Sequence, residues 1–139
     1  MLRSRKQQVW ERAQGCCEYC QMPQENDVRP FQLDHIRAQK HRGQTTTLNL
    51  CLACFDCNIF KSSNPAGFDP KTDKLHPLFN PRRQSWSRHF RWVGATLKGK
   101  TAIGRTTIEV LRINDPLRSQ HRKALIELGV FPPKRLRES

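Results

Sequence analysis

Two C-x-x-C pairs constrain the fold of this chain more than any other feature. The pairs are Cys17 with Cys20 and Cys54 with Cys57, and residues 21–53 separate them. Two residues between cysteines let both thiolates reach one ion while the intervening amides turn around it, an arrangement that suits tetrahedral zinc. The sequence therefore predicts a structural Zn²⁺ site of four thiolates that clamps the intervening segment.

Two further cysteines leave alternatives open. Cys51 is expected to be a small buried residue, whereas Cys16 remains a candidate substitute ligand. A disulfide framework is the alternative to a metal site, and an even number of cysteines does not decide between them. The first fifteen residues contain no apolar segment typical of a signal peptide, and no stretch approaches the length of a membrane span. We therefore expect a cytoplasmic protein without a membrane partner, where cysteines more often bind metal.

The charge of the chain points to a polyanionic partner. Its 139 residues include 25 Lys and Arg against 12 Asp and Glu, which gives a net charge of +13 at pH 7. Such a field attracts nucleic acid first, and no long basic amphipathic helix favours a membrane surface instead. The hydrophobic fraction is 36%. The core of a single small domain is then marginal, and a bound metal would help to stabilise it.

The first half of the chain predicts two helices and two strands. Residues 6–13 have the periodicity of a short helix that ends at Gly15. Alternation of apolar and polar residues predicts a strand at 31–36, and 48–53 is expected to be a second strand. A helix is expected to begin at Cys54.

Alternating aromatic residues predict a hairpin in the second half. Trp86, Phe90 and Trp92 occupy alternate positions before Gly94, whereas the prolines of residues 64–85 exclude long regular elements there. A small core needs such aromatic residues, so we interpret them as core residues. The alternative is that they stack on splayed bases together with the arginines between them.

Two helices are predicted after the hairpin. Residues 104–114 form the first. Asp115 can cap the second, Pro116 suits its first turn and Gly129 stops it. The inward face of this helix is expected to consist of Leu117, His121, Ala124, Leu125 and Leu128.

An acidic residue stands directly before a histidine at the end of the first predicted strand. Hydrolysis of a phosphodiester needs a base for water, and positive charge on the phosphate and the leaving oxygen. His35 can be the base, because a neutral imidazole accepts a proton, and Asp34 can hold a hard cation through oxygen. Asn58 is a candidate second ligand, with helix capping as its rival role. Lys61, one turn further on, can reach a phosphate.

These residues resemble, in order, those of the HNH endonuclease family, whose core is a ββα-metal fold. The resemblance is carried by the first cysteine pair, LDHI at 33–36, LNL at 48–50 and CFDCNIFK at 54–61. It implies that His35 is the general base and that Asn49 holds this histidine and its loop in position. It also implies that Asp34 and Asn58 bind a catalytic divalent ion, Mg²⁺ first, with Mn²⁺ or Ni²⁺ as alternatives. Asn58 stands where the third signature residue is His, and it is a weaker, neutral ligand.

The resemblance also implies an architecture. We expect an α+β fold, in which a zinc-stabilised ββα-metal core is wrapped by a C-terminal hairpin and helices. Residues 1–65 are expected to hold the nuclease core with its zinc knuckles, and 66–139 to form an accessory extension of the same domain. HPLFNPR at 76–82 and INDPL at 113–117 are similar to segments of small stand-alone members of the family.

A basic loop follows the histidine and supplies candidate phosphate contacts. The candidates are Arg37, Lys40, His41 and Arg42. His41, which lies close to Gly43, is more often a loop-shaping residue than a phosphate ligand. Positive charge spread over several short clusters favours contacts to the nucleic-acid backbone with little sequence specificity.

The leading hypothesis is a metal-dependent endonuclease that hydrolyses DNA phosphodiester bonds and leaves 5′-phosphates, as a monomer or weak homodimer. The alternative is a non-catalytic zinc-knuckle module that binds nucleic acid, and a zinc-stabilised scaffold for a protein partner is a third hypothesis. Charge and cysteines are common to the first two. The adjacent Asp34 and His35 separate them, because a binding module has no need for this pair.

Overall fold

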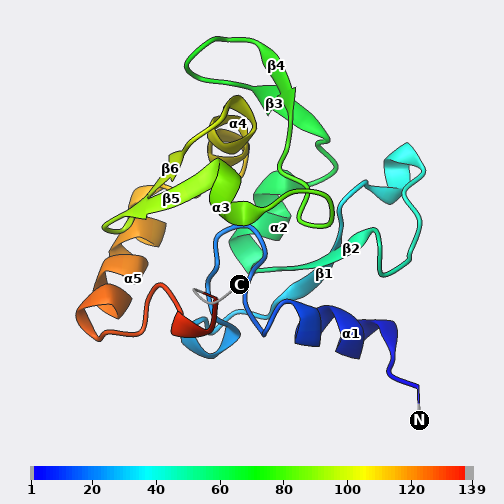
Figure 1. Cartoon of the computed structure of the whole chain (residues 1–139), viewed down its shortest axis with the longest axis horizontal. Coiled ribbons are helices and arrows are strands. Elements are labelled where there is room, and N and C mark those ends of the chain that lie inside the picture. Colours follow the sequence, from blue (N-terminus) through cyan, green and yellow to red (C-terminus); the bar gives the residue numbers. More distant parts are fainter. Residues whose placement is uncertain (1, 137–139) are drawn as a thin grey trace.

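A β-hairpin followed by a helix forms the centre of the computed structural model, which describes residues 2–136 (Figure 1). Strands β1 (Gln32–His35) and β2 (Leu50–Ala53) are antiparallel, and α2 (Phe55–Lys61) follows directly. The register places Asp34 opposite Cys51. The predicted strands at 31–36 and 48–53 are confirmed, each a little shorter than expected.

Helix α1 (Arg5–Arg12) covers this hairpin. A reciprocal capping box between Ser4 and Gln7 fixes its N-terminus. Val9 is fully buried and packs with Leu50 and Leu52 of β2. The amphipathic spacing in the sequence thus produces a helix that buries its apolar side on the strand preceding α2.

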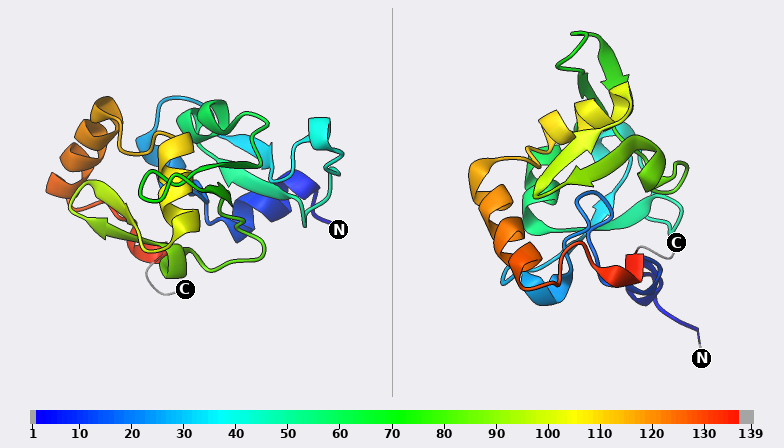
Figure 2. Two further views of the ribbon diagram at one scale, coloured as in Figure 1. Left: turned by 90° about the horizontal axis from the view of Figure 1, so that it is seen from above. Right: turned by 60° about the vertical axis from the view of Figure 1, so that its left-hand side comes forward.

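The remaining elements wrap around this centre (Figure 2). They are the hairpin β3 (Ala66–Phe68) and β4 (Leu75–Pro77), the helical turn α3 (Trp86–His89), the hairpin β5 (Phe90–Val93) and β6 (Thr96–Gly99), and the helices α4 (Ala102–Val110) and α5 (Pro116–Glu127). The described residues also contain three 3-10 turns, which are η1 (Gln24–Asn26), η2 (Gln39–His41) and η3 (Lys134–Leu136). The predicted α+β class, with a C-terminal hairpin and helices, is confirmed.

One cluster of buried side chains joins the first cysteine pair to the C-terminal elements. It includes Tyr19, Phe79, Phe90, Leu111 and Phe131, and each of them is at most 4% exposed. Trp86 and Trp92 pack against the same cluster, so the interpretation of the aromatic residues as core is confirmed. The division at residue 65 stays a prediction, although the shared cluster fits an extension of the same domain.

Two predictions of local structure are wrong. Trp86 begins the helical turn α3 and does not belong to the hairpin strand. The predicted inward face of α5 is also out of phase, because Leu117 and Leu128 are 81% and 74% exposed. Arg122 takes the central buried place at 1% exposure. Its guanidinium donates to the carbonyl oxygens of Ala95 and Ile113 at 3.0 and 2.7 Å, which satisfies the buried charge in a way that periodicity cannot predict.

The hairpin of β3 and β4 was not predicted from the sequence. The buried carboxylate of Asp69 organises its turn by accepting from the backbone N–H of Lys71 and the hydroxyl of Thr72. The guanidinium of Arg105 donates to both oxygens at 3.0 and 2.9 Å and holds the pKa of Asp69 below its ordinary value. Within residues 2–136, no helix has the length and apolar character needed to cross a membrane.

Candidate active site and metal centre

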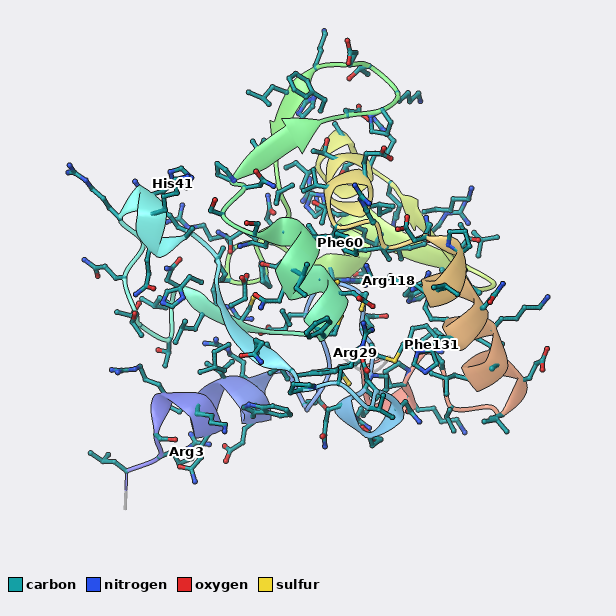
Figure 3. All side chains as sticks on the ribbon, turned by 180° about the vertical axis from the view of Figure 1, so that it is seen from behind. Arg3, Arg29, His41, Phe60, Arg118 and Phe131 are labelled. Atoms are coloured by element: carbon teal, nitrogen blue, oxygen red, sulfur yellow. The ribbon has the colours of Figure 1, made fainter. Side chains whose placement is uncertain are left out.

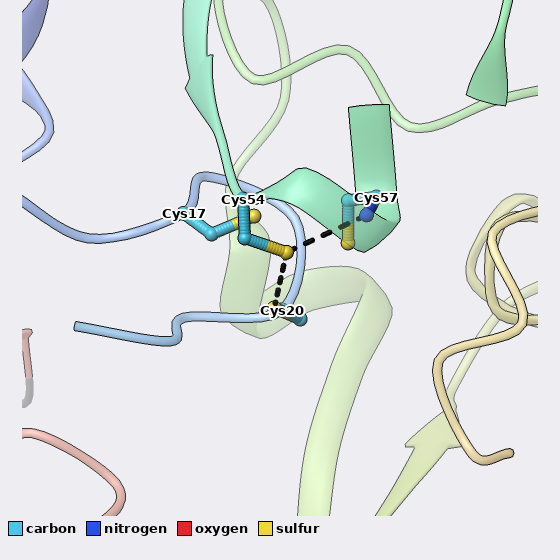
Figure 4. Close-up of side chains that lie close together, drawn as sticks. All are labelled: Cys17, Cys20, Cys54 and Cys57. Atoms are coloured by element: carbon cyan, nitrogen blue, oxygen red, sulfur yellow. Dashed lines mark hydrogen bonds between the residues drawn. The ribbon is translucent and has the colours of Figure 1, made fainter. Parts of the chain in front are cut away.

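Four buried cysteine thiols converge at the start of α2 (Figure 4). The sulfur atoms of Cys17, Cys20, Cys54 and Cys57 all lie within 4.8 Å of one another, and each residue is at most 3% exposed. Cys54 is also the N-cap of α2, and its sulfur accepts the backbone N–H of Cys57. Four buried thiols within reach of one ion fit a structural zinc site, as the spacing predicted.

The thiols of the cysteine cluster shift one another's pKa in opposite directions. Burial raises the pKa of the Cys17 thiol. Hydrogen bonds from Cys17, Cys54 and Cys57 lower the pKa of Cys20 well below its ordinary value. The sulfur atoms of Cys20 and Cys54 lie 3.6 Å apart, and a metal ion bound by all four residues requires each thiol to lose its proton.

The other two cysteines lie outside this cluster. Cys51 is fully buried, and its thiol donates to the hydroxyl of Tyr19 at 3.4 Å, which confirms it as a small buried residue. Cys16 is 1% exposed, and its thiol donates to the carbonyl oxygen of Gln14 at 3.5 Å. Cys16 is therefore not a substitute ligand in this arrangement.

Asp34 lies at the buried face of β1 with two strong partners. The hydroxyl of Tyr19 donates to its Oδ2 at 3.0 Å, and the Nζ of Lys61 lies 3.0 Å from the same oxygen. Burial first, and then the neighbouring Cys51 and Asp34, raise the pKa of Tyr19 well above its ordinary value. The prediction that Lys61 reaches a phosphate does not fit this placement, because its side chain is 2% exposed and its ammonium group is bonded internally.

His35 lies on the opposite side of β1 from Asp34, as alternation along a strand requires. Its ring is half-buried, and its Nε2 lies 2.9 Å from the hydroxyl of Thr45. The side chain of Gln39 also donates to this hydroxyl, at 3.4 Å. The imidazole orientation is therefore fixed from the loop that follows the strand.

A cavity of about 240 Å³ brings the predicted catalytic residues together. Its lining includes Asp34, His35, Lys40, Asn58 and Ser62. Asn58 lies in the interior of α2, and the cap of that helix is a cysteine, so the rival capping role of Asn58 is wrong. Within the described residues, no hydrogen bond engages its side-chain amide, which leaves the amide oxygen available.

Asn49 holds the ends of the basic loop together. Its Oδ1 accepts the backbone N–H of Arg37 at 2.9 Å, and its Nδ2 donates to the carbonyl oxygens of Arg37 and Gln44 at 3.0 and 2.8 Å. The loop closes so tightly that a Cβ on Gly43 would lie 1.7 Å from the carbonyl oxygen of Arg37. Asn49 thus acts on the loop around His35 and does not contact the ring in the described geometry.

The four basic candidates of the loop are exposed around η2, where Figure 3 marks His41. Arg37 donates through Nε to the carbonyl oxygen of His41 at 2.7 Å, which stiffens the turn. Lys40 and Arg42 are both exposed, and Lys40 also lines the cavity. The loop therefore presents positive charge next to His35.

Three residues that matter in this region were missed by sequence reasoning. Tyr19 lies inside the first cysteine pair and holds Asp34, and Thr45 holds His35. Arg118 reaches from α5 to the sulfur of Cys57. Only Tyr19 had a local signal, its place between two metal ligands; Thr45 stands in a run of three threonines that singles out none of them.

Comparison with known proteins supports the resemblance found in the sequence. A model of the HNH endonuclease family matches residues 17–64, the segment that runs from the first cysteine pair to just past the end of α2. The Septu protein PtuB of Bacillus thuringiensis is 25% identical over 118 residues, which cover 84% of this chain and 43% of that protein. The chain thus spans less than half the length of the curated relative it matches. No solved structure matches the chain.

Proposed function

We propose that this protein is a divalent-metal-dependent endonuclease that hydrolyses DNA phosphodiester bonds and leaves 5′-phosphates. The observation that carries the proposal is the single cavity lined by His35, Asp34 and Asn58 inside the HNH segment. A base and two oxygen donors in one cavity are what phosphodiester hydrolysis requires. A module that only binds nucleic acid would have no use for that combination.

His35 is the proposed general base. When the hydroxyl of Thr45 accepts the proton of Nε2–H, the other ring nitrogen keeps its lone pair for a water molecule. Asn49 positions His35 indirectly, because it closes the loop that carries Thr45. The exposed charges of Arg37, Lys40, His41 and Arg42 contact the DNA backbone in this proposal.

Asp34 and Asn58 are the proposed ligands of the catalytic divalent ion. Both line the cavity, and both offer oxygen, which suits an Mg²⁺ ion that keeps several waters and few protein ligands. When bound, such an ion would supply positive charge at the phosphate and the leaving oxygen. The contacts with Tyr19 and Lys61 orient the carboxylate of Asp34 for this role.

The proposal extends to the setting of the protein. A net charge of +13 fits a DNA substrate that is held through its backbone with little sequence specificity. We propose a cytoplasmic protein that works as a monomer or weak homodimer.

Conversion of supercoiled plasmid tests the proposal. Wild type, His35→Ala and the control His121→Ala are compared with Mg²⁺, Mn²⁺, Ni²⁺ and EDTA; His121 is an exposed histidine on α5. We expect metal-dependent nicking by wild type and His121→Ala, its loss in a folded His35→Ala protein, and ends that a kinase labels only after phosphatase treatment. If all three proteins give the same plasmid conversion and bind DNA in a salt-sensitive way, the nuclease proposal is wrong and the non-catalytic binding module is favoured.

A further inference from the structure

A guanidinium group lies directly against the cysteine cluster. Arg118 donates through Nη2 to the sulfur of Cys57 at 3.0 Å, and the same nitrogen lies 3.8 Å from the sulfur of Cys54. Its side chain is 9% exposed. Figure 3 shows Arg118 between α5 and α2. A residue of the C-terminal helix therefore touches the two cysteines that begin α2.

Arg118 is fixed in this position by other groups. Its Nη1 donates to the carbonyl oxygens of Leu111 and Arg112 at 2.7 and 3.2 Å, where α4 has ended. Its Nε lies 3.7 Å from Oδ2 of Asp56, which stands between the second pair of cysteines. Because several partners hold the guanidinium, its contact with the sulfur atoms is preorganised and differs from a flexible surface ion pair.

The negative charge of a zinc site with four thiolates gives a reason for a guanidinium group beside it. Four thiolates around one Zn²⁺ leave a net charge of −2, and a buried net charge is costly unless it is paired and hydrogen-bonded. A guanidinium that donates to sulfur offsets part of that charge. Partners of this kind orient the ligands and tune how tightly the metal is held.

We propose that Arg118 is the counter-charge of the zinc centre, so that zinc retention depends on a residue of α5. Arg118 lies outside the segment 17–64 that matches the HNH family. The C-terminal part of the chain then does more than cover the core, because it completes the metal centre. The inference concerns zinc and does not depend on nuclease activity.

Zinc release from the zinc-loaded protein tests this role. Arg118→Met is compared with Lys123→Met, which removes the same charge from an exposed position of the same helix. Into excess chromogenic chelator, Arg118→Met is expected to release zinc about 10-fold to 100-fold faster than wild type. Lys123→Met should release zinc at the wild-type rate.

Cobalt substitution separates a direct effect on the thiolates from general loosening. Loss of the hydrogen bond to Cys57 should shift the sulfur-to-Co²⁺ charge-transfer bands in Arg118→Met and leave them unchanged in Lys123→Met. If Arg118→Met fails to fold with zinc, Arg118→Lys decides: faster release than wild type supports the role, and an equal rate overturns it. The role is also overturned if Arg118→Met releases zinc at the wild-type rate and keeps the wild-type Co²⁺ charge-transfer bands. It is overturned as well if the wild-type protein contains no zinc.

Discussion

The ammonium group of Lys61 lies 3.0 Å from Oδ2 of Asp34, and both side chains are buried, at 2% and 5% exposure. Lys61 also donates to the carbonyl oxygen of His35 at 2.9 Å. The end of α2 is thereby joined to the end of β1, where the two proposed catalytic residues stand. Removing one member of such a pair costs more than the pair contributes, because the other charge is left buried and unpaired.

Lys61→Met is therefore expected to lower the free energy of unfolding by about 3–5 kcal/mol. Urea unfolding of the zinc-loaded protein measures the change. The double variant Lys61→Met with Asp34→Asn removes both charges and should recover part of the loss. A single variant as stable as wild type would show that the ion pair does not hold these elements together.

Asn49→Ala is expected to open the loop 37–44 and to slow plasmid nicking about 100-fold, because small displacements of a catalytic group have effects of that size. Three side-chain hydrogen bonds are lost, but the strands beside the loop remain paired. Hydrogen exchange of residues 37–44 and the nicking rate are measured together. Asn64→Ala, at an exposed position after α2, is the control. Faster exchange without a slower rate would contradict a positioning role for Asn49.

Features that depend on residues close together in the sequence could be predicted from it. The cysteine pairs could be assigned to one cluster because C-x-x-C spacing itself places two thiols together, and the LDHI and LNL segments could be assigned to paired strands. His35 and Asn58 were expected in one site because the LDHI and CFDCNIFK segments resemble, in order, those of the HNH endonuclease family. The cavity brings these two residues together.

Features that depend on distant partners could not be predicted in this way. Lys61 looks like a surface residue until Asp34 is placed opposite it, and Arg122 looks solvent-facing until two carbonyl oxygens meet it. The same holds for Arg118, whose contacts to the sulfur atoms of Cys54 and Cys57 join residues far apart in the sequence. A prediction from hydrophobic periodicity uses only the polarity of each residue. It therefore assigned Leu117 and Leu128 to the buried face of α5 and did not assign Arg122 to it.

Zinc removal should unfold the protein, because the cysteine cluster joins the first knuckle to α2 and lies within the main core. Circular dichroism during chelation measures the unfolding. Metal analysis of two variants identifies the ligands: Cys57→Ala should lose the metal, whereas Cys51→Ala should keep the wild-type zinc content because Cys51 lies outside the cluster. A chelated protein that stays folded would contradict a structural role for zinc.

Acid is expected to weaken the fold through His89. Its ring is buried, with Nδ1 2.6 Å from the hydroxyl of Thr101, and burial first and the charge of Arg88 second lower the pKa of His89. As the pH falls, His89 therefore takes up a proton more readily in the unfolded chain than in the folded chain. The stabilising effect of the neutral ring is complete above the unfolded pKa of about 6.5 and is lost as the pH falls below it.

Urea unfolding of wild type and His89→Gln at pH 7.5 and pH 5.5 measures this contribution. Glutamine cannot take up a proton in this range, so the variant should lose less stability on acidification than wild type. Protonation of the zinc thiolates affects both proteins equally and cancels in the comparison. Equal losses of stability in the two proteins would place the acid sensitivity elsewhere, most directly in the cysteine cluster, whose thiolates must also take up protons as the metal leaves.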